Sequence, residues 1–136
     1  MASPLTDVVT CFVVRDGEIL LLKRSQKVGT YRGCWSGVSG YLETADPEDQ
    51  AWTELREEVG GTPDQLMLRR TGKPMLVTDD ALGRTWRVHP FRFAANGDFE
   101  PRLDWENLKS CWVTPDSLNS MSTVPGLAAA WKRVSE

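Results

Sequence analysis

Apolar and polar residues alternate along much of the chain, and this alternation predicts a succession of short strands. The stretch "VVTCFVVRDGEILLLKRS" holds two β-rich runs separated by Asp16-Gly17, a dipeptide that favours a tight hairpin turn. We therefore expect two antiparallel strands over residues 8–24. The residues that follow, 26–46, contain four glycines, which favour a loop with short extended pieces over a helix.

The pattern changes to helical spacing at residues 47–59. Asp46 is a good N-cap, Pro47 suits the first turn of a helix, and Gly60-Gly61 supplies a stop. Apolar residues at every fourth position give this helix one apolar face, which we expect to pack on the sheet. They are Ala51, Leu55 and Val59, with Trp52 beside them.

More strands and two more helices are predicted in the second half of the chain. "QLMLRRTGKPMLVTDD" and "RTWRVHPFRFAA" are typical of strands joined through a turn at residues 80–83, and "LKSCWVTP" is typical of another strand. "TPDSLNSM" begins with a capping pattern and predicts a short helix, and "VPGLAAAWKRVSE" predicts a terminal helix. Strands and helices thus mix along one chain.

Length and composition bound the class of protein. With 136 residues the chain is long enough for one domain with a core and too short for two ordinary ones, so we treat 1–136 as a single domain. Hydrophobic residues make up 40% and charged residues 26%, as in soluble globular proteins. No segment has the roughly 18 to 20 apolar residues that cross a bilayer, and "MASPLTDVV" lacks the features of a signal peptide. We expect a cytoplasmic protein without membrane association.

Charge and cysteine usage exclude further classes. The formal charge is −3 and the basic residues are scattered, so nothing supports nucleic-acid binding. A mildly acidic protein can still bind polyphosphates when a divalent cation lies between them. Cys11, Cys34 and Cys111 lie far apart without CxxC spacing, so neither a disulfide framework nor a zinc site is indicated, and small core residues are expected.

The predicted helix at 47–59 carries an acidic cluster with two interpretations. Glu54, Glu57 and Glu58 stand at i, i+3 and i+4, which makes them neighbours on one surface, near the helix end where the dipole disfavours anions. In the first interpretation Arg56 and other basic side chains neutralise a solvated face. In the second, the carboxylates hold a hard cation such as Mg²⁺, which takes oxygen ligands in octahedral geometry.

The whole stretch "GYLETADPEDQAWTELREEVGG" resembles the Nudix box, a loop-helix-loop with the pattern G-x5-E-x7-R-E-U-x-E-E-x-G-U, in which U is aliphatic. The predicted strands also fit the order of that family's α/β/α sandwich. The resemblance therefore implies an α/β fold of this type with a mixed β-sheet. The matching residues are Gly40, Glu54, Leu55, Glu57, Glu58 and Gly60.

The box departs from the pattern in its loop. It is one residue shorter, so Ala45 or Asp46 stands where the early glutamate belongs, and Thr53 replaces the arginine before the first helical glutamate. Gly61 replaces the last aliphatic residue. In the family the arginine and the early glutamate are thought to brace the loop against the helix. A Nudix-fold module that binds a nucleotide without turnover is therefore a second hypothesis.

Other stretches resemble one subgroup of the family. "YRGCWSGVSGYLE", "VHPFRF" and "LDWENLKSCWV" are similar to Nudix domains that in some chains accompany a domain resembling initiation factor 2B subunits. This similarity suggests ancestry or an association, and it names no substrate.

The family resemblance implies an activity and a set of residues. Nudix enzymes hydrolyse a nucleoside diphosphate linked to another group, usually with Mg²⁺ or Mn²⁺. By position, the metal ligands are the Gly40 carbonyl, Glu54, Glu57 and Glu58, and Glu57 is the first choice for the essential one. Glu54 and Glu57 are the catalytic candidates. The alternatives for the general base, which must reach the attacking water, are Glu54, Glu57, Asp104 and Glu106; an ordinary polar turn is the competing interpretation of the last two.

Further residues are candidates for contact with a small-molecule nucleotide. Arg24 and Arg32 can pair with phosphate through a planar guanidinium, although surface solvation is the alternative for each. Tryptophans can stack on a nucleobase or pack in the core. Those considered are Trp35, Trp86 and Trp105. The single histidine, His89, alternates with apolar residues, which favours a structural or substrate-lining role over catalysis. A homodimer is a further possibility, since dimers are the commonest assembly.

Overall fold

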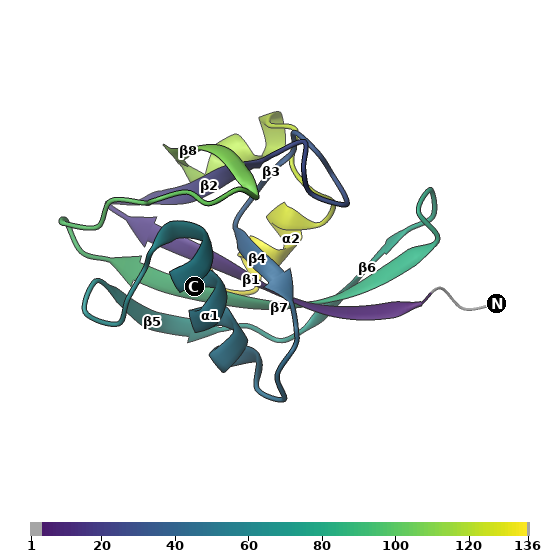
Figure 1. The fold of residues 1–136 in the computed structure, drawn as a ribbon, viewed down its shortest axis with the longest axis horizontal. Helices are drawn as coiled ribbons and strands as arrows, with labels where there is room; N and C mark the ends of the chain where they lie inside the picture. Colours follow the sequence, from purple (N-terminus) through teal and green to yellow (C-terminus); the bar gives the residue numbers. More distant parts are fainter. Residues whose placement is uncertain (1–3, 136) are drawn as a thin grey trace.

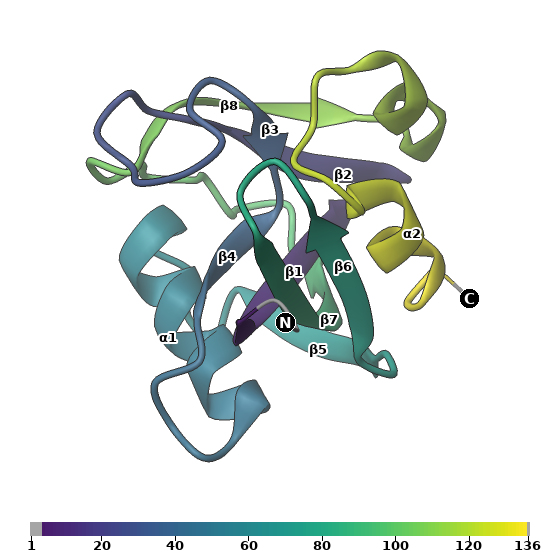
Figure 2. The ribbon, with the colours of Figure 1, turned by 90° about the vertical axis from the view of Figure 1, so that its right-hand side faces the viewer.

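The computed structural model describes residues 4–135, in which a twisted sheet lies between two α-helices (Figures 1 and 2). The predicted hairpin begins the fold. Strands β1 (Leu5–Arg15) and β2 (Glu18–Arg24) pair antiparallel. Asp16 and Gly17 between them have φ of 52° and 79°, the left-handed conformation that a two-residue hairpin turn needs and that Asp and Gly tolerate.

The sheet is mixed because β1 pairs in parallel with β7 (Arg84–Ala95), which lies far along the chain. The other pairings between these strands are antiparallel: the path runs β3-β2-β1-β7-β5, while β4 pairs with β1, β6 with β7 and β8 with β2. The expected class, an α/β fold with a mixed sheet, is confirmed. The remaining strands are β3 (Trp35–Ser36), β4 (Val38–Tyr41), β5 (Leu66–Thr71), β6 (Met75–Asp79) and β8 (Asn107–Val113).

Helix α1 (Pro47–Val59) begins and ends where its caps predict. The Asp46 side chain accepts a hydrogen bond from the backbone N–H of Glu48 at 3.0 Å, which satisfies one of the free donors of the first turn. Gly60 ends the helix at φ 71°, a conformation that costs glycine little.

The short helix and the terminal helix predicted in this part of the chain are both present, and each differs in detail. Pro115–Ser120 forms a 3₁₀-helix, and Thr114 does not cap it with its side chain. The terminal helix, α2, covers only Leu127–Lys132, because Gly126 takes a left-handed φ of 80° packed against Val77. Residue 136, which the prediction included, lies outside the described residues.

Each face of the sheet carries its own core. Along β2, Leu20 and Leu22 face α1, whereas Ile19 and Leu21 face α2, as the alternation of side chains in a strand requires. The expected apolar face of α1 joins the first core, and Cys11 is fully buried in it. The three cysteines are free thiols. Within residues 4–135 no helix is long and apolar enough to cross a membrane.

Candidate active site

Gly40 lies in β4 against the carboxylate of Glu54. The strand pairs with β1, where Gly40 is opposite Val9, and it packs on α1. A Cβ atom on Gly40 would overlap Glu54 Oε1. Only glycine therefore leaves room for this carboxylate beneath the strand.

Gln50 joins the loop after β4 to the helix. Its Oε1 accepts a hydrogen bond from the backbone N–H of Glu43 at 2.9 Å, and its Nε2 donates to Glu54 Oε2 at 3.1 Å. The residue is buried. Thr53, which stands where the pattern has arginine, bonds only its own helix through Asp49 O. The Gln50 amide thus connects loop and helix. Gln50 was not among the residues predicted from the sequence, although it stands at i, i+4 to Glu54 on the predicted helix.

Glu54 is a buried carboxylate without a cationic partner. It is 8% exposed, and burial, reinforced by the negative charges of Glu57, Glu106 and Glu43, raises its pKa to about 7 despite the hydrogen bond from Gln50. A carboxyl group with this pKa changes its charge near neutral pH, which is a property common at functional sites.

Glu58 lies deeper than Glu54, at 4% exposure. Its Oε1 accepts a hydrogen bond from Asn107 Nδ2 at 3.0 Å, while its Oε2 is buried without a partner. Burial, followed by the charge of Glu106, raises its pKa well above the ordinary value. Asn107 begins β8, so the carboxylate is held between two elements. Buried oxygens usually have a hydrogen-bond partner, so this one calls for a partner such as an ion or a water molecule.

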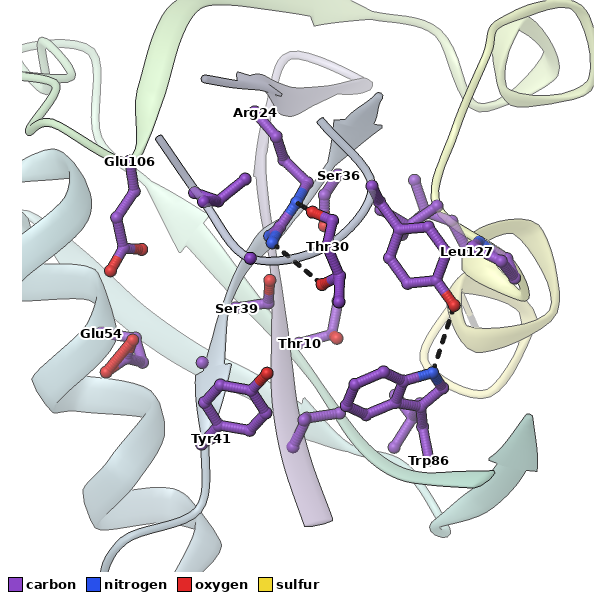
Figure 3. Close-up of a pocket in the computed structure, with 18 of the residues that line it drawn as sticks. Thr10, Arg24, Thr30, Ser36, Ser39, Tyr41, Glu54, Trp86, Glu106 and Leu127 are labelled. Atoms are coloured by element: carbon purple, nitrogen blue, oxygen red, sulfur yellow. Dashed lines mark hydrogen bonds between the residues drawn. The ribbon is translucent and has the colours of Figure 1, made fainter. Parts of the chain in front are cut away.

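A pocket of about 280 Å³ opens beside these residues (Figure 3). Glu54, Glu57 and Glu106 all line it, together with Glu43. Glu106 comes from the loop before β8, and burial, followed by the charge of Asp104, raises its pKa. Three sequence candidates for acid or base chemistry therefore share one wall. Asp104 itself accepts a hydrogen bond from the backbone N–H of Glu106 at 3.0 Å, which is a turn contact.

The interpretation of the acidic cluster as a solvated face is wrong for two of its members. Glu54 and Glu58 are buried, and only Glu57 is exposed. Arg56 pairs with none of them, since the ion pairs found in residues 4–135 are those of Asp7 with Arg87 and His89. Within residues 4–135, no ion pair therefore compensates the cluster.

The donor set fits a hard divalent cation. Carboxylate and carbonyl oxygens are the ligands that Mg²⁺ and Mn²⁺ prefer. Gly40 has no side chain that would displace the Glu54 carboxylate, and Glu58 Oε2 lacks a hydrogen-bond partner. In the described part of the chain, however, no three Asp, Glu, His or Cys side chains are already gathered as a metal site. Glu54 and Glu57 line the pocket, whereas Glu58 does not.

The residues predicted to touch substrate are only partly brought together. Arg24 lines the pocket, but its Nε donates to Thr30 O at 3.0 Å and its Nη2 to Thr30 Oγ1 at 3.5 Å. Arg32 is exposed, donates to Val28 O and does not line the pocket. Trp35 also lies outside it and packs in the core on the α2 side. Trp86 and Trp105 do line it.

Several lining residues were not singled out from the sequence. They come from strands and loops that the fold brings to the same place, and Figure 3 shows several of them between the carboxylates and α2. They are Thr10, Thr30, Tyr31, Ser36, Ser39 and Tyr41. Tyr31, Ser36, Ser39 and Tyr41 lie within the stretch 31–43 that resembles the subgroup, whereas Thr10 and Thr30 carried no such signal.

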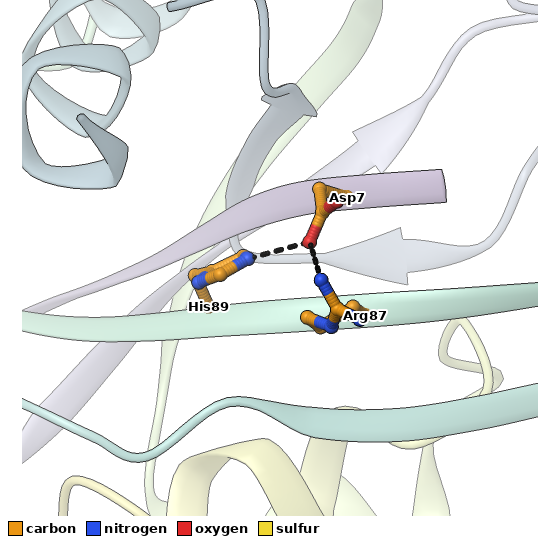
Figure 4. A network of polar contacts seen from close by, with 3 residues as sticks. All are labelled: Asp7, Arg87 and His89. Carbon is orange, nitrogen blue, oxygen red and sulfur yellow. Dashed lines mark hydrogen bonds and ion pairs between the residues drawn. The ribbon is translucent and has the colours of Figure 1, made fainter. Parts of the chain in front are cut away.

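His89 lies outside the pocket, in a separate polar network (Figure 4). Its Nε2 is 2.8 Å from Asp7 Oδ1, and Arg87 Nη1 donates to the same oxygen at 3.3 Å. The hydrogen bond from His89, with the help of Arg87, lowers the pKa of Asp7 despite some desolvation. This network joins β1 to β7.

Comparisons with known proteins agree with the fold. No curated protein sequence matches. A solved structure of a MutT NUDIX hydrolase from Burkholderia pseudomallei is 26% identical, with a TM-score of 0.74 over 96% of this chain and 98% of that chain. A MutT protein from Methanosarcina mazei Go1 is 20% identical, with a TM-score of 0.76 over 98% of this chain and 94% of that chain.

A third structure is the NUDIX domain of Shewanella oneidensis NrtR in complex with ADP ribose. It is 13% identical, with a TM-score of 0.72 over 98% of this chain and 86% of that chain, and at this identity it supports the fold alone. The sequence model of the NUDIX domain matches residues 4–133, which is nearly the whole chain. This protein therefore belongs to the NUDIX domain family.

Proposed function

We propose that this NUDIX protein is a divalent-metal-dependent hydrolase that cleaves the pyrophosphate bond of a nucleotide or nucleoside diphosphate derivative. One observation carries the proposal: Glu54, Glu57 and Glu106 line one pocket, and within residues 4–135 none of them forms an ion pair, the charge of Arg24 reaching Glu106 alone. Structures of similar fold point to the same class of ligand. One is a C. elegans Ap4A hydrolase in a binary complex, and another holds ADP ribose.

The cofactor we propose is Mg²⁺ or Mn²⁺. Glu54, Glu57, Glu58 and the Gly40 carbonyl would hold it, as the box positions imply. When bound, such an ion neutralises charge on a diphosphate and lowers the pKa of water. The chain's own contribution is to fix these oxygens, which Gly40 and Gln50 do for Glu54 and Asn107 does for Glu58.

A general base is available on the same wall. Glu54 and Glu57 are the catalytic residues that we propose, and Glu106 is the third candidate because it lines the pocket with a raised pKa. Asp104 is the weakest of the four, since its Oδ1 is engaged in the turn. Glu54, Glu57 and Glu106 all line the pocket, so each stands where an attacking water would have to be placed.

The test is hydrolysis of a panel of nucleoside triphosphates, dinucleotides and nucleotide sugars with Mg²⁺ or Mn²⁺, comparing wild type with Glu57→Gln. We expect metal-dependent turnover that falls at least a hundredfold in the variant. Glu48→Gln, on an exposed part of the same helix, is the matched control and should retain activity. Turnover unchanged in Glu57→Gln would refute the proposal.

The second candidate is a binding module without turnover. It is favoured by the absence, within residues 4–135, of three acidic side chains already gathered for a metal. Ligand binding without hydrolysis in the same panel would support it. The cytoplasmic location, a homodimer and the subgroup associated with initiation factor 2B-like proteins stay predictions.

A further inference from the structure

The pocket has two chemically different sides (Figure 3). Glu54 and Glu106 stand on the side of α1, whereas Trp86 and Leu127 stand on the side of α2. Between them lie Thr10, Ser36 and Ser39, which are neutral. The α2 side, which we call the aromatic side, is lined by Tyr31, Val77, Trp86, Val124 and Leu127, and the Tyr41 ring lies between Glu54 and Trp86 in Figure 3.

The aromatic side is built from rings that hold one another. The Trp86 ring is 6.2 Å from that of Tyr41 and 6.4 Å from that of Tyr31, between ring centres. Trp86 Nε1 donates to Tyr31 Oη at 3.3 Å, and Tyr31 Oη donates to Asp79 Oδ2 at 2.7 Å. These bonds tie the loop after β2 to the hairpin of β6 and β7. The rings offer a ready surface for a flat group.

Cations are scarce in the pocket. Arg24 is the one basic side chain among the lining residues in the described part of the chain, and Thr30 already occupies two of its donor nitrogens. Arg84 is close, but its guanidinium lies over the Trp86 ring at 4.6 Å and does not line the pocket. Asp79, behind Tyr31, adds a negative charge. The aromatic side thus has little to offer a phosphate.

Charge therefore limits how many phosphates the pocket accepts. The carboxylates can hold divalent ions against phosphates only on their own side of the pocket. Each further phosphate extends the negative chain toward a wall of rings and hydroxyls, where its loss of water is not compensated by a cation. An uncharged ring meets no such cost there, and its burial is favourable.

We infer that the aromatic side takes an uncharged planar group joined to a diphosphate, and that the protein discriminates against longer phosphate chains. This inference rests on the proposed function and narrows its substrate class. The preference comes from the scarcity of cations on the aromatic side, since Arg84 stacks on Trp86 and does not line the pocket, with the rings held by Tyr31 and Asp79 as the receiving surface.

A matched pair of compounds tests it, because diadenosine diphosphate and diadenosine tetraphosphate have the same ends and differ in phosphate number. With Mg²⁺ we expect kcat/KM at least tenfold higher for the diphosphate, which corresponds to about 1.4 kcal/mol. Equilibrium binding to the wild type with a chelator, where no metal-dependent turnover occurs, should show the same order. A tetraphosphate that is cleaved and bound as well as the diphosphate would overturn the inference.

A charge insertion sharpens the test. Tyr41 is 48% exposed, so Tyr41→Lys places a cation at the pocket wall without opening a core. We expect the preference for the diphosphate to fall at least threefold. Leu76→Lys adds the same charge to an exposed position outside the pocket and should leave the preference unchanged. Equal changes in both variants would refute the role of the missing cation.

The hydrolysis and binding experiments distinguish a failure of the proposed hydrolase function from a failure of the inference on phosphate number. If neither compound nor any member of the panel is hydrolysed, the proposed function fails, and the inference is decided by the binding experiment alone. If hydrolysis occurs but kcat/KM is higher for the tetraphosphate than for the diphosphate, the proposed function stands and the inference is wrong. Failure of both compounds to bind would also overturn it, since the aromatic side should retain an adenosine end.

Discussion

Two groups of acidic side chains lie on the same face of the sheet, and they differ in how their charge is balanced. Asp7 has an imidazole and a guanidinium within hydrogen-bond distance, and its pKa is lowered. Glu54 and Glu58 have only amide partners, and burial raises the pKa of both.

The difference separates a carboxylate whose charge is balanced by other side chains from the carboxylates that we propose as metal ligands. The charge of Asp7 is balanced by His89 and Arg87, and the network is partly exposed, so no further ligand is needed to stabilise it. Burying a carboxylate without a cationic partner destabilises the folded state. Carboxylates of this kind are common at functional sites, where a bound cation or substrate offsets the destabilisation. Four predictions test this contrast.

The largest effect is expected from Gly40→Ala. The new methyl group would displace the Glu54 carboxylate, so kcat/KM should fall at least a hundredfold, which corresponds to about 2.7 kcal/mol. Gly97→Ala is the control, because a Cβ there meets nothing within 4 Å and its φ is not positive. Steady-state kinetics of both variants decide the point. Full activity in Gly40→Ala would mean that Glu54 need not sit beneath β4.

The second effect is the dependence of stability on pH without divalent ions. Because folding raises the pKa of Glu54 from about 4.5 to about 7, the folded state binds more protons, and its free energy of unfolding falls as pH rises through that window. We expect a loss on the order of 2 kcal/mol, to which Glu58 adds in the same direction.

Asp7 has the opposite sign, since its stabilisation is lost only as pH falls through its lowered pKa, below the ordinary 3.8. Urea unfolding near pH 5 and near pH 8, with and without Mg²⁺, measures the difference. Mg²⁺ should restore stability mainly at the higher pH, where Glu54 is ionised. A Glu54→Gln variant that keeps the full pH dependence would contradict the assignment to Glu54.

The third effect is smaller and concerns Gln50. Gln50→Ala removes the link between Glu43 and Glu54, so we expect kcat/KM to fall about tenfold while the fold persists. Gln26→Ala, an exposed glutamine, is the matched control. Circular dichroism and kinetics together distinguish misplacement of Glu54 from unfolding. An unchanged rate would show that the loop needs no such link.

The smallest effect is expected from Asp7→Asn. The network is partly exposed, and such ion pairs contribute less than about 1 kcal/mol. Stability should fall by no more than this, and activity should stay within about twofold of wild type. A large loss of activity would place the network in the site and end the contrast with Glu54 and Glu58.

Much of the fold could be predicted because its signals are local. Asp16-Gly17 set the first turn, Asp46 and Gly60 set the ends of α1, and each reports on neighbours a few residues away. The terminal helix was predicted too long because its start depends on Gly126 packing against Val77, a contact between distant parts of the chain.

The site was predictable only where it lies on one element. The spacing of Glu54, Glu57 and Glu58 follows from helical geometry, but which of them is buried depends on β4 and β8. The residues around Asn107 carry no sequence pattern that predicts its hydrogen bond to Glu58. Trp35 was a candidate for substrate contact by residue type, yet its backbone bonds to Ser122 and Val124, and its side chain packs in the core on the α2 side.

The parallel pairing of β1 with β7 also governs how the chain assembles. Leu5 lies opposite Thr85 and Val14 opposite Ala94, so the central ladder joins segments that leave the ribosome far apart in time. Contacts of such long sequence separation form slowly, because a large loop must close first. The first hairpin and α1 can form early, but the contact between the Trp86 and Tyr41 rings can form only after β7 has been synthesised. A nascent chain that stops before β7 therefore carries the acidic helix without a pocket.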